Sequence, residues 1–244
     1  MLIYINILSA HDTAFVIGKN NKSMGVFQPL IYGYNEKIDI STHPILFFIK
    51  PNIKLKIYHS KIKNINFATR YSFEYITPLL KLMQHRGYFA LISEDPNIGK
   101  INQILTLKTE ILGTKKNQNY TITGKAGISI CPRCKIDDRH IIDYDLIYPR
   151  MVLYKNNIDA NLGLDINYYF SKKILFKTDL DLIFIPKENP FIEHKFIFNY
   201  ILSKKYTLSA GYKYCYGFYP FNKDKGQWNL FPLIDIKWNF RINN

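Results

Sequence analysis

Long hydrophobic runs are absent from this sequence of 244 residues. The longest internal apolar run, Ile45 to Ile49, is far shorter than the ~20 consecutive apolar residues that a transmembrane helix needs. Helical insertion into a membrane is therefore excluded. A transmembrane β-strand needs only ~9 to 11 residues, in which apolar and polar side chains alternate. The lack of long runs thus leaves a membrane β-barrel open.

Cysteine is scarce, since the chain contains three. Cys131 and Cys134 have CxxC spacing, and His140 lies nearby in the sequence. A zinc site would need a second pair of ligands and a redox motif would need a βαβ context, so we expect neither function. In an exported chain, Cys131 and Cys134 form a small loop disulfide or two unreacted thiols, with Cys215 as the odd cysteine. No metal or cofactor is expected, and no glycine-rich phosphate loop is present.

Acidic residues are outnumbered: 33 Lys and Arg stand against 19 Asp and Glu, a net charge of +14. Such a charge attracts polyanions, including the phosphates of anionic lipid and lipopolysaccharide. The cations are spread along the chain, and the joint richness in Lys, Asn and Ile is typical of a biased genome. No RNA- or DNA-binding motif accompanies the charge. We therefore expect no nucleic-acid partner.

Apolar and polar residues alternate along much of the sequence, most clearly from Tyr206 to Phe240. From Leu208 to Phe218 every second residue is apolar or aromatic, and the residues between them are small or polar. After a loop, the stretch from Pro232 to Phe240 repeats the pattern. A period of two indicates a strand. The C-terminal end of the chain therefore predicts a hairpin of two long strands.

The same alternation recurs upstream, with short turns between successive stretches, as is typical of an antiparallel meander. The count is about twelve strands, an even number such as closed membrane barrels prefer. Ile76 to Gly99 and Cys131 to Tyr144 are long connections, and Thr77 to Gly87 has the spacing of a short helix. We therefore predict an all-β fold, an antiparallel up-and-down transmembrane β-barrel. The expected strands cover residues 24–34, 37–42, 52–58, 65–74, 105–111, 120–130, 147–154, 158–170, 174–185, 191–202, 206–218 and 228–240.

Charged residues share one side of these strands. A charge facing hydrocarbon costs roughly 2 to 4 kcal/mol near the middle of a bilayer, so in a membrane barrel this side faces the lumen. About twelve strands also enclose more volume than apolar side chains can fill, which argues against an inward apolar face. The aromatic residues gather near strand ends, where a membrane interface would lie. The residues expected to face the lumen are Asp159, Asp165, Lys177, Asp179, Asp181, Glu193, Lys195, Lys213, Asp235 and Lys237.

The last strand carries large residues at alternate positions, Ile236, Trp238 and Phe240, shortly before the sequence ends. In this it resembles the terminal strand of Gram-negative outer-membrane β-barrel proteins, a porin-like class. The resemblance implies that these three residues form the signal read by the barrel assembly machinery. It also implies a place in the cell outer membrane, in contact with its lipid and with lipopolysaccharide.

Residues 1–10 look like the apolar and cleavage regions of a signal peptide that lacks its basic start. The mature protein is then a single barrel domain over residues 11–244. If both ends of that domain lie in the periplasm, the expected strand count puts both long connections on the periplasmic side.

These features favour a non-enzymatic integral barrel, either a narrow porin or channel or a structural component of the envelope. The alternatives are a barrel that binds an envelope protein through its loops, an outer-membrane lipid-modifying enzyme, and a soluble lipid-binding barrel. Outer-membrane phospholipases and lipid A deacylases use a His and a Ser that are separated by one intervening residue. Here His59 and Ser60 are adjacent and point to opposite faces of a strand. No catalytic residue is therefore expected.

Overall fold

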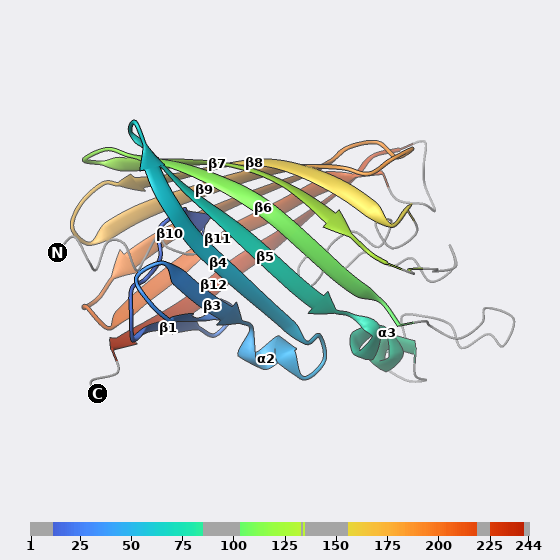
Figure 1. Cartoon of the computed structure of the whole chain (residues 1–244), viewed down its shortest axis with the longest axis horizontal. Helices are drawn as coiled ribbons and strands as arrows, with labels where there is room; N and C mark the ends of the chain where they lie inside the picture. Colours follow the sequence, from blue (N-terminus) through green and yellow to red (C-terminus); the bar gives the residue numbers. More distant parts are fainter. Residues whose placement is uncertain (1–11, 85–102, 133, 135–155, 219–224, 242–244) are drawn as a thin grey trace, which may run out of the picture.

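In a computed structural model, the chain folds into a closed barrel of twelve antiparallel strands (Figure 1). The structure describes residues 12–84, 103–132, 134, 156–218 and 225–241. Each strand of the ring pairs with its neighbours in sequence, and the ring closes where the first strand pairs with the last. The predicted all-β, up-and-down barrel of about twelve strands is confirmed.

The opening strands of the ring are short. β1 (Asn21–Gly25), β2 (Leu30–Gly33) and β3 (Ile38–Thr42) span 5, 4 and 5 residues. In Figure 1, β1 and β3 occupy one end of the barrel, whereas the later strands run along its length. The long strands are β4 (Asn52–Ile62), β5 (Ile65–Tyr75), β6 (Leu105–Lys116), β7 (Tyr120–Ile130), β8 (Ile158–Tyr169), β9 (Ile174–Phe184), β10 (Phe191–Ile201), β11 (Tyr206–Gly217) and β12 (Gln227–Arg241).

The two faces of the long strands have opposite character. On β12 the side chains of Asp235 and Lys237 are 8% and 3% exposed, whereas those of Trp228 and Ile234 are 65% and 73% exposed. In soluble proteins, charged side chains are seldom so deeply buried. The barrel therefore has a polar interior and an apolar outer surface.

Two short helices lie at the ends of strands. α2 (Pro44–Phe47) connects β3 to β4, and the imidazole of His43 accepts a hydrogen bond from the N–H of Leu46 at its start. α3 (Thr77–Gln84) follows β5 and confirms the helical spacing seen in the sequence. In the described part of the chain, neither helix has the length and apolar character needed to cross a bilayer.

The first strand expected from the sequence, over residues 24–34, is in fact two strands. β1 and β2 are joined by a turn over residues 26–29, and Oδ1 of Asp235 accepts the N–H groups of Val26 and Phe27 at 2.8 and 3.2 Å. The carboxylate satisfies two turn donors that have no strand partner. The prediction of one strand is wrong because Asp235 lies more than 200 positions away, beyond the reach of a local pattern.

The extra strand changes the side on which the long connections lie. The chain turns once more before β5 ends, so the connections after β5 and after β7 leave from the end opposite to that where β1 begins and β12 ends. The expectation that both lie on the side of the termini is therefore wrong. The expected strand over residues 147–154 lies outside the described residues, and β7 pairs directly with β8.

The barrel wall is shorter along the barrel at β1, β2 and β3 than elsewhere, because these strands have only four or five residues. β1 pairs with residues 237–241 of β12, so within the described chain residues 227–236 have a strand partner on the β11 side alone. The N–H of Asn239 donates to the carbonyl of Lys205 on that side, so even-numbered residues direct their backbone groups toward β1. Pro232 is one of them. Because proline has no N–H, it costs no ladder hydrogen bond at this free edge.

Substituting Asp235 by alanine is expected to weaken the closure between β1 and β12. The carboxylate accepts N–H groups from Val26, Phe27 and Ile236, and hydrogen bonds to charged groups contribute about 1.5–3 kcal/mol each. On SDS gels of samples heated to increasing temperatures, the band of the folded barrel should disappear at a temperature several degrees lower than in the wild type. Glu188→Gln, in the turn between β9 and β10, is the control and should keep the wild-type temperature. An unchanged temperature in Asp235→Ala would contradict this role.

Candidate functional site

The segment ahead of β1 runs through the interior of the barrel. Ala14 is fully buried and packs with Ala68 of β5 and Leu112 of β6. Its N–H donates to Oγ1 of Thr114 at 2.8 Å. These three strand residues lie on the polar, inward side of β5 and β6. Residues 12–18 therefore occupy part of the lumen, and we call them the N-terminal plug.

An ion pair between β3 and β4 holds the N-terminal plug. Asp39 and Lys56 lie 3.4 Å apart, with side chains only 3% and 6% exposed. The carboxylate of Asp39 accepts the N–H of Ile17 at 3.1 and 3.2 Å, and Nζ of Lys56 donates to the carbonyls of Thr13 and Phe15. A buried ion pair needs such additional hydrogen bonds to offset its desolvation. The plug and the ion pair therefore stabilise each other.

Two glycines allow the N-terminal plug to end tightly against β2. Gly18 has a φ of +81°, a conformation that favours glycine. A Cβ atom at Gly33 would overlap the carbonyl oxygen of Gly18. The N–H of Asn20 then donates to the carbonyl of Gly33 at 2.9 Å. The chain thus turns from the lumen into the wall of the barrel without a gap.

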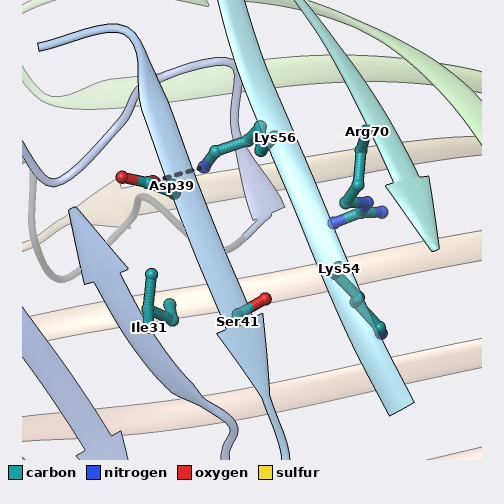
Figure 2. A pocket seen from close by; sticks show the side chains of 6 residues that line it. All are labelled: Ile31, Asp39, Ser41, Lys54, Lys56 and Arg70. Carbon is teal, nitrogen blue, oxygen red and sulfur yellow. Dashed lines mark ion pairs between the residues drawn. The ribbon is translucent and has the colours of Figure 1, made fainter. Parts of the chain in front are cut away.

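A small cavity lies beside the Asp39–Lys56 pair. Figure 2 shows these two side chains turned toward each other, while Lys54 and Arg70 extend from β4 and β5. The cavity has a volume of about 10 Å³, enough for about one water molecule. The space between these side chains is therefore small. The cavity is lined by Ile31, Asp39, Ser41, Lys54, Lys56 and Arg70.

Lys125 of β7 lies at the centre of an acidic cluster. Its Nζ is 3.3 Å from Asp165 of β8, and 2.7 and 2.9 Å from Asp179 and Asp181 of β9. Lys195 of β10 lies 3.1 Å from the other oxygen of Asp179. Three carboxylates thus share two ammonium groups across four neighbouring strands. We call these five residues the Lys125 cluster.

A second network of charges lies on β5 and β6. Nε of Arg70 lies 2.7 Å from Glu110, and Nζ of Lys108 lies 2.9 Å from the other oxygen of the same carboxylate. Toward the strand ends, Lys50 and Glu74 pair at 2.7 Å. Charged-group hydrogen bonds are shorter and stronger than neutral ones. These pairs fix the side chains that narrow the lumen on this side.

The residues expected to face the lumen have different surroundings. Glu193 and Lys213 form an ion pair at 2.9 Å, and Asp159 and Lys237 are 6% and 3% exposed. Asp235 is committed to the turn between β1 and β2, so it is not an isolated pore charge. The Lys125 cluster contains Asp165, Asp179, Asp181 and Lys195, and Lys177 lies on β9 two residues before Asp179, on the same side of the strand.

Sequence reasoning missed several charged residues of the interior. The signal that could have found them is the one used for later strands, since each lies on the polar side of an alternating stretch. The N-terminal plug has no such periodic signal, because its place depends on distant partners. Among the missed residues are Asp39, Lys56, Arg70, Glu110 and Lys125.

The residues of the expected assembly signal lie on the last strand. Ile236 and Phe240 are 40% and 44% exposed on the apolar outer face. Trp238 pairs with Met24 of β1 and with Tyr206 of β11, at the closure of the ring. Their recognition by assembly machinery stays a prediction.

The three cysteines lie at two places in the barrel. The sulfur atoms of Cys131 and Cys134 are within bonding distance, with Cα atoms 5.5 Å apart, in the arrangement of a small loop disulfide. Cys215 is buried on β11, opposite Glu193 of β10 in the register of the two strands. Among the described residues, no cluster of His, Cys, Asp and Glu could hold a metal ion.

β4 has a bulge between Tyr58 and Ser60, so His59 has no partner residue on β5. Nε2 of His59 lies 2.9 Å from Oγ1 of Thr69. The imidazole of His59 therefore contacts a threonine of the adjacent strand. Among the described contacts of His59, none activates a serine.

No protein-family model matches this sequence. No curated protein matches it either. Solved structures with similar folds include the KdgM porin in complex with disordered oligogalacturonate, at 8% identity and a TM-score of 0.49 over 91% of this chain and 97% of that one. Acinetobacter baumannii OccAB4 has 12% identity and a TM-score of 0.45 over 88% of this chain and 52% of its own. OmpT of Vibrio cholerae has 10% identity and a TM-score of 0.41 over 87% and 63%. Because these TM-scores are below 0.5, we base the function on this chain's own geometry.

Lys125→Met is expected to destabilise the barrel strongly. The substitution leaves Asp165 and Asp181 without the ammonium group that lies within 3.3 Å of both, and breaking a buried ion pair costs about 3–5 kcal/mol. Urea unfolding in detergent, followed by circular dichroism, measures the loss. Lys125→Met combined with Asp165→Asn should recover part of it, because one buried charge is removed. Equal stability of the wild type and Lys125→Met would show that solvent screens the Lys125 cluster.

Proposed function

We propose that this chain is an integral outer-membrane β-barrel that acts as a narrow porin-like channel, restricted by the N-terminal plug. The observation that carries the proposal is the inverted burial of side chains. Lys125 and Lys237 are 8% and 3% exposed inside the ring, whereas Trp228 and Ile234 are 65% and 73% exposed on its outside. Water disfavours such an outer surface, and the hydrocarbon of a bilayer favours it.

The backbone supports the same environment. A chain can cross hydrocarbon only if its peptide groups are hydrogen-bonded internally, which a closed ring of strands achieves. β4 to β12 have 11 to 15 residues each, against the ~9 to 11 that a tilted strand needs to cross a bilayer. A soluble lipid-binding barrel would place its apolar side chains inside. In this barrel the inward side of the strands carries ion pairs instead.

The outer membrane is the location we propose, because single-chain barrels of this kind are typical of it. Lipid and lipopolysaccharide then surround the apolar face. The barrel assembly machinery is the partner we propose for the last strand, where Ile236 and Phe240 are exposed.

The interior favours a narrow passage. The N-terminal plug fills part of the lumen between β3, β4 and β6. The Lys125 cluster and the pair of Arg70 with Glu110 add long side chains from other strands. Small ions and solutes are therefore the class that such a lumen admits.

Heat modifiability tests the membrane barrel. Purified in detergent, the protein should give a β spectrum by far-ultraviolet circular dichroism. Without boiling it should migrate differently on an SDS gel than after boiling, because the hydrogen bonds of a closed ring of strands make unfolding slow. Channel currents in planar bilayers test the pore. A protein that is soluble without detergent and shows no mobility shift would overturn the proposal.

Asp39→Asn should loosen the N-terminal plug. A neutral amide is a weaker acceptor for the N–H of Ile17 and removes the charge attraction to Lys56. Hydrogen exchange followed by mass spectrometry should show faster exchange in a peptide that covers residues 12–20, and mean channel current should rise. Glu188→Gln serves again as the control. Wild-type exchange of this peptide in Asp39→Asn would mean that the plug is held elsewhere.

A further inference from the structure

The cavity beside the Asp39–Lys56 pair has a mainly cationic lining. Lys54, Lys56 and Arg70 are three of its six lining residues, and Asp39 is the one acid among them. The register of the strands brings the lining together, because Ser41 of β3 lies opposite Lys54 of β4. Lys56, two positions along β4, lies opposite Asp39 of β3 and Arg70 of β5. Neighbouring strands therefore surround the cavity at one level of the wall (Figure 2).

The acid of this lining is already engaged. The carboxylate of Asp39 lies 3.4 Å from the ammonium of Lys56 and accepts the N–H of Ile17 at 3.1 and 3.2 Å. Asp12 of the N-terminal plug adds a second negative charge, which also attracts Lys56. Both acids therefore act on Lys56, two residues along β4 from Lys54.

In the described part of the chain, Lys54 is the cation of this lining that no carboxylate contacts. Its ammonium forms neither an ion pair nor a hydrogen bond with these residues. Glu74 attracts it most strongly but lies 2.7 Å from Lys50. Glu110 of β6 lies 2.7 Å from Arg70 and also pairs with a lysine of its own strand. Removing an ammonium group from water is costly unless an anion compensates it. The cavity therefore borders one positive charge that no described contact balances.

We propose that this cavity is a binding site for one small inorganic anion of about the size of chloride, with the ammonium of Lys54 and the hydroxyl of Ser41 as its donors. Among the described residues the hydroxyl of Ser41 has no hydrogen-bond partner. A charged donor and a hydroxyl on adjacent strands together suit a monovalent anion, and Arg70 adds a second positive charge from β5. The bound anion links β3 with β4 beside the ion pair that holds the N-terminal plug. The site goes beyond the proposed channel, because it does not depend on conduction.

The size and lining of the cavity select the class of anion. Its volume of about 10 Å³ is enough for about one water molecule, and chloride is only slightly larger than water. Phosphate, sulfate and carboxylates have several heavy atoms and exceed this space. Ile31 supplies an apolar part of the lining, where a weakly hydrated anion loses less solvation than a strongly hydrated one. Chloride and bromide are therefore the ligands that fit.

Two measurements on the full chain in a non-ionic detergent test the site. The first is the line width of the chloride NMR signal, which increases when chloride exchanges with a site on a large, slowly tumbling particle. The second is the midpoint of urea unfolding in sodium chloride and in sodium gluconate at equal ionic strength, since gluconate is too large for the cavity. An anion that binds only the folded barrel stabilises it. The wild type should broaden the signal, lose this broadening when bromide is added, and unfold at a higher urea concentration in chloride.

Three variants examine the two donors. Lys54→Met should weaken chloride binding by about tenfold or more, because it removes a charged donor. Its unfolding midpoint should become the same in the two salts. Lys54→Arg keeps the charge and should recover most of the binding. Ser41→Ala removes the hydroxyl without changing the charge and should weaken binding by about fivefold, the effect of one neutral hydrogen bond.

Lys61→Met is the matched control. Lys61 lies on the same strand but is exposed, near the turn between β4 and β5. Its substitution should leave chloride binding within about twofold of the wild type, because salt screens exposed charges. Equal losses in Lys54→Met and Lys61→Met would overturn the site, since a general attraction of anions would then explain them.

Other outcomes would also overturn the site. One is a wild type without bromide-sensitive broadening, whose cavity would then hold water at most. Another is an unchanged affinity in Ser41→Ala, which tests the site even if Lys54→Met does not fold. Neither measurement needs a current, so chloride binding by a barrel that does not conduct would support the site and contradict the channel. A conducting barrel that binds no chloride would give the opposite result. The boiling-dependent mobility shift of each variant confirms that its barrel has closed.

Discussion

Hydrogen bonding of the backbone is the constraint on which this structure depends. In the bilayer that we propose around the barrel, no water reaches the outer surface to satisfy peptide groups, so each strand must find its donors and acceptors on its neighbours. The pairing of β1 with β12 completes this requirement around the ring. Where β1 ends early, two local features take over. The carboxylate of Asp235 accepts the N–H groups beyond the end of the ladder, and Pro232 lacks the donor that would be left over.

The interior follows from the same inversion. With apolar side chains outside, the alternate positions bring charged groups into a confined volume, where each needs a partner. The Lys125 cluster achieves this with residues of four neighbouring strands, whereas Asp39 and Lys56 use the backbone of the N-terminal plug. The plug therefore has two roles. It narrows the lumen, and its backbone groups are hydrogen-bond partners for charged residues of the wall.

The sequence could predict what depends on neighbours along the chain. The period of two from Leu208 onward located β11 and β12, and the irregular spacing after Thr77 located α3. The split of residues 24–34 into β1 and β2 could not be predicted, because it depends on Asp235 near the other end of the chain. The same reason hid the N-terminal plug, whose partner Thr114 lies 100 positions away. Alternation could place Lys125 on a polar face, but only the register of β7, β8 and β9 brings three carboxylates to it.

The seam between β1 and β12 has a consequence for the order of folding. Oγ of Ser23 donates to Asn239 across 216 positions of sequence, whereas the long hairpins from β4 onward join residues that are close along the chain. Contacts between distant residues form late, because the entropy of closing so long a loop must be overcome first. Sequential hairpins can therefore assemble into an open, curved sheet while the ends of the chain are still apart. Until the last strand arrives, β1 and β11 are two exposed edges, the form in which such a sheet is most prone to pair with another chain.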